Sequence, residues 1–530
     1  MSGKSRASSN KKIIIYAVIG ILAVAAVAIT LMPRGAGPEL QSGGQLAEDS
    51  KQRSIARFEE QLCGNDAKAN SNAHITEYVL PSECEIPLGI AADGDRIWYV
   101  STKQGILGSY SPADNNFEEH PVPSWPARSD PTGISQVFAV RLDESGNVWF
   151  TDDKSNLLWR FSKSSGTFDK FVSPAVGPIS FDFDANGDLY LVGVRSNSIF
   201  FGELAKMKPD TQEGFTEIKL PLEAFADIRD NAINSGSITV DKERNVVWTT
   251  ILSYQTIGQI FEYDIASKEV AVTDLPGGLT SPVGTVLDNE GNLWLTDHGT
   301  SVFFMLDSSE GTITRYVTSI PSSRIFGGQT PENAVSWPYW LQSDNDGNIW
   351  FNQHAGNKIA RFGPQTQTLV EYWIPSQNEN WGNCPEGSAT CGIANAVQFS
   401  VGPGGQAWFT EWSENKIGTV KNPDAPFSVS APGEVTVEKG ESVEVKVDVS
   451  SQDGFAGRMI ASGTFSYSGS LGNSTGIFSQ QSVEVGAGST EQLSYVFTPA
   501  DDLAQGQYML MVGAENDDVA VLKAVRVNVV

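Results

Sequence analysis

Asp143-Glu-Ser-Gly-Asn-Val-Trp-Phe-Thr-Asp152 is the clearest copy of a phrase that recurs along this chain. Close relatives of the phrase stand at 288–297 (DNEGNLWLTD), 344–353 (DNDGNIWFNQ) and 402–411 (GPGGQAWFTE). Each copy joins a short apolar segment to an acidic Gly/Asn turn and then to an aromatic-rich segment. This order predicts two antiparallel strands connected by a tight turn.

Seven copies can be aligned on the aromatic residue of the second segment. They are spaced 41 to 58 residues apart, and their anchors are Trp98, Trp149, Tyr190, Trp248, Trp294, Trp350 and Trp408. A strand-rich unit repeated at this period indicates a β-propeller. The sequence therefore predicts an all-β chain with a seven-bladed β-propeller at residues 74–424.

The seventh unit has no fourth strand of its own before the repeat ends. However, Ile75-Thr-Glu-Tyr-Val-Leu-Pro81, ahead of the first unit, resembles the fourth strand of the other units, such as Leu369-Val-Glu-Tyr-Trp-Ile-Pro375. An open ring would leave unpaired strand edges. We therefore expect the N-terminal strand to complete the last blade and close the ring.

The segments that flank the propeller differ from it in composition. Residues 33–73 are rich in Gly, Ser, Ala, Gln and charged residues and indicate a tether. Residues 425–530 alternate apolar and polar positions in short strands separated by Gly/Asp turns, which predicts an immunoglobulin-like β-sandwich.

The N-terminal segment indicates an attachment to a membrane. Residues 13–32 are an unbroken apolar run of helix-spanning length, and residues 1–12 form a basic tail that contains Lys4, Arg6, Lys11 and Lys12. The positive charges predict a single-pass cell-membrane protein with a cytoplasmic N-terminus and its bulk outside the cell or in the periplasm. A cleavable signal peptide is the alternative.

The four cysteines all follow the apolar run. An even number in an exported region predicts two disulfides, Cys63–Cys84 and Cys384–Cys391. The net charge of −27 argues against nucleic acid as a partner, because binding to phosphates requires a basic surface.

Trp408-Phe-Thr-Glu-Trp412 with Asn415-Lys-Ile-Gly418, echoed by Trp350-Phe351 with Asn357-Lys-Ile359, resembles the virginiamycin B lyase (streptogramin lyase) family of seven-bladed propellers. The resemblance covers the propeller only. It implies a magnesium ion and a catalytic histidine near the central channel, with Glu411 at the place of a metal-binding glutamate.

Two further positions of that family pattern differ here. Asn395 stands where the family has a second glutamate, and Val397 stands where it has the catalytic histidine. A valine side chain cannot transfer a proton. This departure favours ligand binding over the lyase activity of the family.

Acidic or amide residues end the second strand of four units, and a histidine follows two of them. If these strand ends share one face, carboxylates and imidazoles there could bind magnesium or another divalent metal. The candidate metal ligands are Glu411, Asp297, His298 and His354. Alternatively, the carboxylates cap their own turns by accepting backbone N–H bonds.

Other polar and aromatic residues are expected at the same face. Aromatic rings beside acids and amides suit sugars, cyclic peptides or cationic ligands. The candidate ligand-binding residues are Asp152, Gln353, Asn395, Trp337, Tyr339 and Trp381.

Three classes of function remain open from the sequence. The first is a surface protein that binds a small molecule, a glycan or a cell-surface protein. The second is a metal-dependent lyase that cleaves a C–O bond, or a hydrolase, acting at the top face of the propeller. The third is a structural protein of the cell envelope.

Overall fold

The computed structural model describes residues 63 and 68–530, apart from 130–133, 195, 224–233, 254–256, 320–334, 379, 381–391, 464–470 and 472. Within these ranges the regular secondary structure is almost entirely β-strand. The one α-helix among the described residues is the short α3 (Pro126–Ser129).

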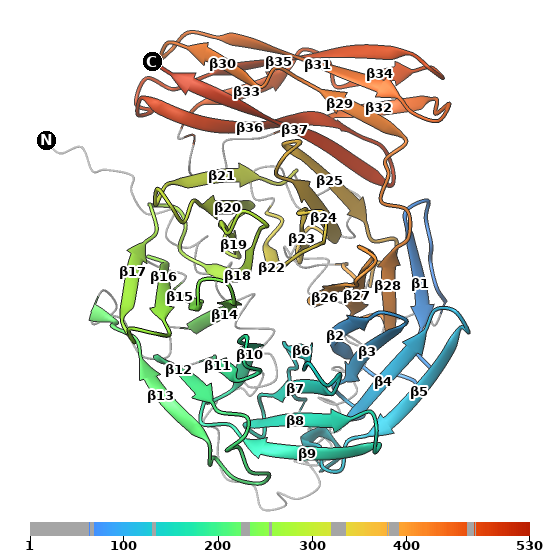
Figure 1. Cartoon of the computed structure of the whole chain (residues 1–530). Helices are drawn as coiled ribbons and strands as arrows, with labels where there is room; N and C mark the ends of the chain where they lie inside the picture. The colour runs from blue at the N-terminus through green and yellow to red at the C-terminus, as the bar shows by residue number, and fades with distance from the viewer. Residues whose placement is uncertain are drawn as a thin grey trace, which may run out of the picture.

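Seven four-stranded antiparallel units surround a common centre, as Figure 1 shows. In blades one to six the chain runs outward from the innermost strand, so neighbours in sequence are neighbours in the sheet. The described residues therefore form the seven-bladed propeller that the repeat predicts.

The strands of the first four blades follow one another from the centre to the rim. Blade one contains β2 (Pro87–Asp93), β3 (Arg96–Ser101), β4 (Ile106–Ser111) and β5 (Asn116–Pro121). Blade two contains β6 (Val140–Leu142), β7 (Val148–Asp152), β8 (Leu157–Ser162) and β9 (Thr167–Val172). Blade three contains β10 (Pro178–Phe183), β11 (Leu189–Gly193), β12 (Ser198–Gly202) and β13 (Phe215–Lys219). Blade four contains β14 (Asn234–Asp241), β15 (Val246–Leu252), β16 (Gln259–Asp264) and β17 (Val270–Asp274).

The last three blades follow the same order. Blade five contains β18 (Pro282–Leu287), β19 (Leu293–Asp297), β20 (Val302–Leu306) and β21 (Ile313–Val317). Blade six contains β22 (Pro338–Ser343), β23 (Ile349–Gln353), β24 (Lys358–Gly363) and β25 (Thr368–Trp373). Blade seven contains β26 (Phe399–Val401), β27 (Ala407–Glu411), β28 (Lys416–Val420) and, at its rim, β1 (Ile75–Val79).

The ring closes through the N-terminal strand, as predicted. β1 pairs antiparallel with β28 from Ile75 opposite Val420 to Val79 opposite Lys416. Tyr78 of β1 also stacks on Trp408 of the same blade, with ring centroids 5.7 Å apart. Blade seven is thus built from the two ends of the propeller segment.

The recurring phrase forms a blade because its aspartate holds both the turn and the tryptophan. Asp143 accepts the backbone N–H of Asn147 at 2.9 Å and the indole N–H of Trp149 at 2.8 Å. The turn between them needs Gly146, whose φ of 75° strains other residues. Asp288 and Asp344 bind the indoles of their own blades at the same distance, so the acidic turn is chiefly a structural device.

The C-terminal residues form two further sheets. One contains β29 (Phe427–Ser430), β31 (Val443–Ser451), β35 (Thr490–Thr498) and β33 (Thr475–Phe478). The other contains β37 (Val519–Val529), β36 (Gly506–Glu515), β32 (Gly457–Gly463) and β34 (Ser482–Val485), with β30 (Glu434–Val437) parallel to β37. Their apolar residues share one core, so this is a two-sheet module, and its immunoglobulin-like assignment stays a prediction.

The two-sheet module is joined to the propeller by a shared sheet. β37 pairs antiparallel with β25, the rim strand of blade six, from Thr368 opposite Lys523 to Tyr372 opposite Val519. Leu369 and Leu522 face each other in this pairing and are both fully buried. Blade six and one sheet of the module therefore form a single continuous sheet.

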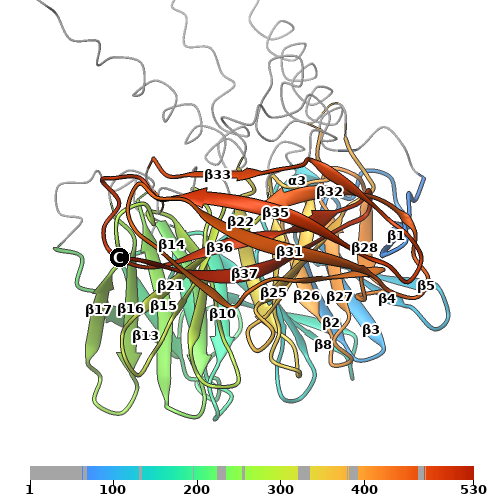
Figure 2. The same cartoon turned by 90° about the horizontal axis from the view of Figure 1, so that it is seen from above.

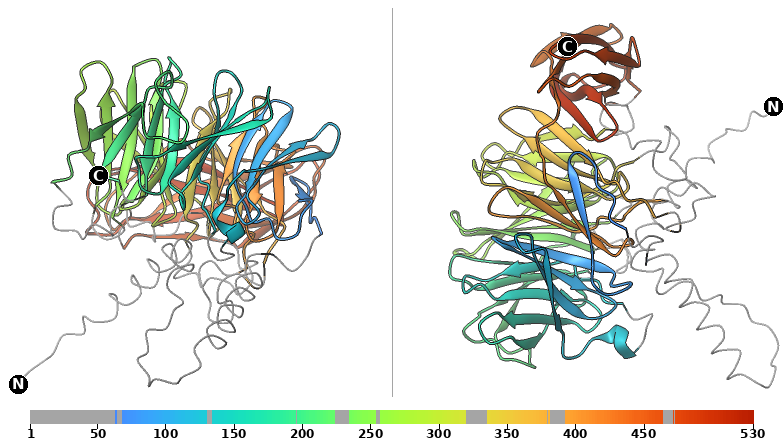
Figure 3. Two further views of the ribbon diagram at one scale, coloured as in Figure 1. Left: turned by 90° about the horizontal axis from the view of Figure 1, so that it is seen from below. Right: turned by 90° about the vertical axis from the view of Figure 1, so that its right-hand side faces the viewer.

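The module lies at the rim of the ring rather than over either face. The side view in Figure 3 shows its strands beyond the edge of the propeller, and Figure 2 shows β36 and β37 in front of the blades. Rim strand β21 of blade five also contacts β36. Both ends of the central channel are thus left uncovered by the strands of the module.

The structure bears on two predictions about the N-terminal region. Cys63 is bonded to Cys84, as predicted, whereas Cys384 and Cys391 lie outside the described residues. The apolar run at 13–32 also lies outside them. Within the described part of the chain, no helix has the length and apolar character needed to span a membrane.

Ring closure can be tested at Ile75, which is fully buried in β1. Ile75→Ala leaves a cavity between the closing strand and blade seven, so we expect a loss of about 2–5 kcal/mol of stability. The thermal midpoint measures this loss. Ile477→Ala is the matched control, because Ile477 is 64% exposed on β33, and it should shift the midpoint little. Equal shifts for the two variants would contradict a stabilising role for β1.

Candidate functional site

Equivalent residues of adjacent blades gather at one face of the propeller, where the second strand of each blade ends. In blades five and six the residue after the second strand bonds to the segment that leads into the first strand. The N–H of His298 bonds to the carbonyl of Ser281 at 2.8 Å, and that of His354 bonds to the carbonyl of Trp337 at 3.0 Å. His298 and His354 therefore occupy the same position in their blades.

The two histidines lie together among aromatic rings. Their ring centroids are 5.7 Å apart with an interplanar angle of 21°. Tyr339 lies 4.3 Å from His298, and Trp337 lies 5.7 Å from His298 and 6.2 Å from His354. Asn395, from blade seven, bonds through its side-chain oxygen to Nε2 of His354. We call these five residues the histidine–aromatic cluster.

Several polar atoms of this cluster are buried without a hydrogen-bond partner among the described residues. They are both ring nitrogens of His298, Nδ1 of His354 and Nδ2 of Asn395. A buried polar group without a hydrogen bond costs about 1–3 kcal/mol, so such groups are rare without a purpose. Tyr339 keeps part of its surface accessible, which leaves the cluster in contact with the outside.

The bond to Asn395 fixes the protonation pattern of His354. Because the amide oxygen only accepts, Nε2 of His354 carries the proton and Nδ1 is left as an acceptor. Burial lowers the pKa of His354 to about 4 and that of His298 well below its usual value, with His354 adding to the second effect. Both imidazoles are neutral at physiological pH.

Asp297, a predicted metal ligand, is committed to its own turn. One carboxylate oxygen accepts the N–H of Ser281 at 2.6 Å, and the other accepts the hydroxyl of Thr300 at 2.8 Å. Burial raises the pKa of Asp297 to about 6, although these hydrogen bonds oppose the rise. This geometry agrees with the alternative interpretation, in which the carboxylate of Asp297 caps its own turn.

Glu411 lies in a different buried cluster of blade seven. Lys416 is 3.5 Å from Glu77 and 3.4 Å from Glu414, and it donates to Ser376 at 2.7 Å. Both oxygens of Glu411 are buried and accept no hydrogen bond from the described residues, while the protonated carboxyl group can donate to Glu77. Burial, followed by the charge of Glu77, raises the pKa of Glu411 well above its usual value.

Blade six contains the same arrangement with one informative difference. Lys358 is 3.2 Å from Glu371, and both side chains are fully buried. Gln353, at the position equivalent to Glu411, donates its amide N–H to Glu371 at 2.6 Å. A protonated Glu411 is the carboxylic-acid counterpart of this glutamine, since both present a donor and an acceptor.

The four predicted metal ligands do not form one coordination sphere. No hydrogen bond or ion pair between described residues joins Glu411 to His298 or His354. Within the described ranges, no group of three or more His, Cys, Asp or Glu side chains is placed to hold a metal ion. The described residues do not show the expected convergence: Asp297 binds its own turn, and Glu411 faces partners from β1 and β28. The magnesium prediction itself stays a prediction.

The remaining candidates fall in several places. Asp152 accepts the hydroxyl of Ser135 at 2.6 Å and the N–H of Ser155 at 3.1 Å, so it also caps a turn. Gln353 supports Glu371 rather than a ligand. Trp337, Tyr339 and Asn395 belong to the histidine–aromatic cluster, and Trp381 lies outside the described residues.

Sequence reasoning missed the two buried lysines. The signal was present in the repeated Asn-Lys-Ile of the third strand, at Lys358 and Lys416, and in the Glu-Tyr of the fourth strand, at Glu371 and Glu77. A lysine and a glutamate repeated on neighbouring strands indicate a cross-strand ion pair.

The fold defines this chain as a seven-bladed β-propeller with a C-terminal two-sheet module. Among solved structures it is similar to virginiamycin B lyase from Staphylococcus aureus, with 20% identity, a TM-score of 0.49 and coverage of 65% of this chain and 98% of that one. A streptogramin B lyase structure matches with 21% identity and a TM-score of 0.49 over 66% of this chain and 99% of that one.

A structure of U3-55K matches with 12% identity and a TM-score of 0.46, over 66% of this chain and 99% of that one. At these identities the likeness concerns the fold alone. No family model and no curated protein matches the chain.

Because the pKa of Glu411 is raised in the folded chain, the free energy of unfolding should depend on pH, and replacing Glu411 with glutamine should remove this dependence. Below the ordinary glutamate pKa, folded and unfolded chains both hold the proton. Above it, only the folded chain does, so the stability contributed by the protonated group falls as pH rises. We expect Glu411→Gln to match the parent chain in thermal midpoint at pH 4.5 and to exceed it increasingly up to pH 7.5.

Glu484→Gln, at an exposed residue of β34, is the control and should show no such trend. A midpoint for Glu411→Gln below that of the parent chain at pH 7.5 would refute the protonated assignment. A rise with added magnesium in the parent chain alone would instead support a metal at Glu411.

Proposed function

We propose that this chain is a ligand-binding propeller that holds a neutral small molecule at the histidine–aromatic cluster. The observation that carries the proposal is the set of buried, unpartnered nitrogens on His298, His354 and Asn395. A ligand that forms hydrogen bonds with these nitrogens would remove the free-energy cost of burying them unpaired. The adjacent rings of Trp337 and Tyr339 offer the apolar contact that small-molecule sites use.

The protonation pattern defines the chemistry of the ligand. Nδ1 of His354 accepts, so it requires an N–H or O–H donor, whereas Nδ2 of Asn395 donates, so it requires an oxygen acceptor. Neutral imidazoles give no charge to pair with an anion. An amide or hydroxyl group beside a flat ring satisfies these requirements.

The location and the C-terminal module form part of the proposal. The apolar run at 13–32 with its basic flank supports a membrane anchor with a cytoplasmic N-terminus. The Cys63–Cys84 disulfide supports an oxidising compartment for the folded part. The two sheets of the C-terminal module support an immunoglobulin-like assignment.

A metal-dependent lyase or hydrolase is the weaker proposal. Val397 occupies the place of the family's histidine and is buried, and it offers no group for proton transfer. Neither histidine of the cluster contacts Glu411 through a bond between described residues. Ligand binding therefore fits this geometry better, because it needs neither a proton-transfer group at position 397 nor a metal ion at Glu411.

Benzamide is the smallest probe that carries the required donor, acceptor and ring. We expect it to give saturation-transfer NMR signals with the full-length chain, whereas toluene and benzoate give weaker ones. His298→Phe keeps the ring packing and removes both nitrogens, so benzamide affinity should fall about fivefold to tenfold. His120→Phe, at a histidine packed on Trp98 and Phe161 in the rim of blade one, should leave it unchanged. Equal binding of benzamide and toluene would rule out the polar site.

The affinity for benzamide should be constant between pH 6 and 8. Both imidazoles are neutral over that range, because the pKa of His354 is about 4 and that of His298 is also depressed. Protonation of His354 near pH 4 converts its acceptor nitrogen into a donor and should weaken binding. A titration centred between pH 6 and 7 would contradict the buried, neutral state of the histidines.

A further inference from the structure

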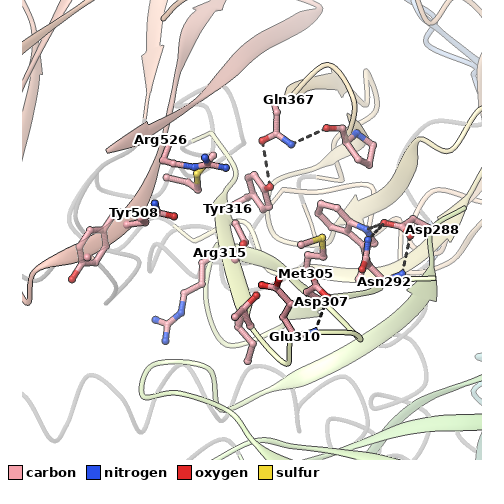
Figure 4. Close-up of a pocket in the computed structure, with 18 of the residues that line it drawn as sticks. Asp288, Asn292, Met305, Asp307, Glu310, Arg315, Tyr316, Gln367, Tyr508 and Arg526 are labelled. Carbon is pink, nitrogen blue, oxygen red and sulfur yellow. Dashed lines mark hydrogen bonds between the residues drawn. The ribbon is translucent and has the colours of Figure 1, made fainter. Parts of the chain in front are cut away.

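A second cleft lies between the propeller and the two-sheet module, at the rim of the ring. Its volume is 880 Å³, within the range of small-molecule sites. Strand β21 of blade five forms one wall, the ends of β36 and β37 form another, and the turn between β24 and β25 contributes Gln365 and Gln367. Figure 4 shows the side chains that line this cleft, in which the guanidinium groups of Arg315 and Arg526 point in different directions.

Two arginines line the cleft without an ion pair to any described residue. Arg315 comes from β21 and Arg526 from β37, so each unit supplies one guanidinium group. Within the described part of the chain, neither group has an ion pair or a side-chain hydrogen bond. Burial lowers the pKa of Arg315, which marks a guanidinium partly removed from water. A guanidinium group in a cleft is suited to bidentate recognition of an anion.

The acidic residues of the cleft are mostly occupied elsewhere. Asp288 binds the indole N–H of Trp294, and Asp307 caps the turn that contains Ser309. Glu290 accepts the amide of Gln365 at 2.7 Å. In Figure 4, Asp288 and Asn292 lie on the side of the cleft opposite to Arg315, Tyr508 and Arg526. The hydrogen-bonded carboxylates keep their charge and, with Glu310, can still accept the hydroxyl groups of a ligand, whereas the arginines lie apart from Asp288.

Aromatic and amide groups complete the lining. Tyr316 donates to the side-chain oxygen of Gln367 at 3.3 Å, and Tyr508 donates to the carbonyl of Ala504 at 2.8 Å. Both phenol groups are thus held in place beside the arginines. Tyrosine rings with amides and acids around them suit the faces and hydroxyl groups of sugar rings.

We propose that this cleft binds an acidic saccharide, with one sugar carboxylate at Arg315 and another at Arg526. The partly exposed Tyr508 contacts the sugar, while Tyr316 is packed in the core below it, and the carboxylates and amides of the opposite wall accept the hydroxyl groups of the sugar. The cleft uses residues from blades five and six and from the module, so it exists only because β37 docks on β25. It is independent of the histidine–aromatic cluster, which lies at the channel.

Calorimetric titration of the full-length chain with tetragalacturonate tests the proposal. We expect binding that weakens about tenfold or more in Arg526→Gln, because one charge-assisted contact is lost. Arg526 is exposed, so this variant should keep its thermal midpoint. Arg315→Gln should have the same effect. Arg458→Gln, on β32 of the same module but outside the cleft, is the matched control.

Neutral maltotetraose and a sulfated tetrasaccharide separate the alternatives. Maltotetraose should bind at least tenfold more weakly than tetragalacturonate, and equal binding of the two would overturn the role of the carboxylate. Binding of the sulfated sugar alone would also overturn the carboxylate assignment. Tetragalacturonate that does not bind, or that binds equally to the parent chain and to both arginine variants, would overturn the site. His298→Phe should leave this binding intact, so its failure is distinguishable from that of the channel site.

Discussion

The pairing of β1 with β28 is the constraint on which the rest of the structure depends. A propeller blade buries its faces against two neighbours, so an unpaired last blade would expose a sheet edge and loosen both adjacent blades. Closure also has an electrostatic consequence. Glu77 belongs to β1, and it is the partner that β1 brings to the buried Lys416. The strand that closes the ring thus also compensates a charge that blade seven buries.

Blades six and seven each bury a lysine side chain, and they compensate its charge in different ways. A buried lysine is tolerated when a carboxylate pairs with it and further hydrogen bonds satisfy both groups. Blade six adds an amide at Gln353, which requires no proton from solvent. Blade seven places Glu411 there, next to Glu77 and Glu414, where three carboxylates face one lysine. Holding a proton on Glu411 brings the second site to the same hydrogen-bonding pattern as the first.

The turns, the strands and the closure of the ring were predictable from the sequence, because each depends on a short pattern that the chain repeats. The Asp-x-x-Gly-Asn-x-Trp phrase determines a turn and an indole bond within ten residues, and the likeness of 75–81 to a fourth strand predicts ring closure. His298 and His354 follow the same strand in adjacent blades and their rings lie 5.7 Å apart, whereas the sequence pattern grouped them with Asp297 and Glu411 as well.

What the sequence did not predict depends on partners from distant segments. The docking of β37 on β25 joins two strands whose own patterns would also suit a free edge and a separate domain. The partners of Glu411 come from β1 and from the loop before β28, so its position on β27 alone could not show that it faces a lysine. The sequence pattern identifies the strands. Which strands pair with each other depends on contacts between segments that are far apart in the sequence.

The shared sheet between blade six and the C-terminal module has a mechanical consequence. The described chain enters the ring at blade seven through β1 and ends in β37, which is hydrogen-bonded along β25 of blade six. A pull between the two ends of the chain would pass through these two neighbouring blades and the segment that links them. It would act along antiparallel strands, where many hydrogen bonds resist sliding together. Blades one to five, including the wall of the rim cleft at β21, would stay outside that path.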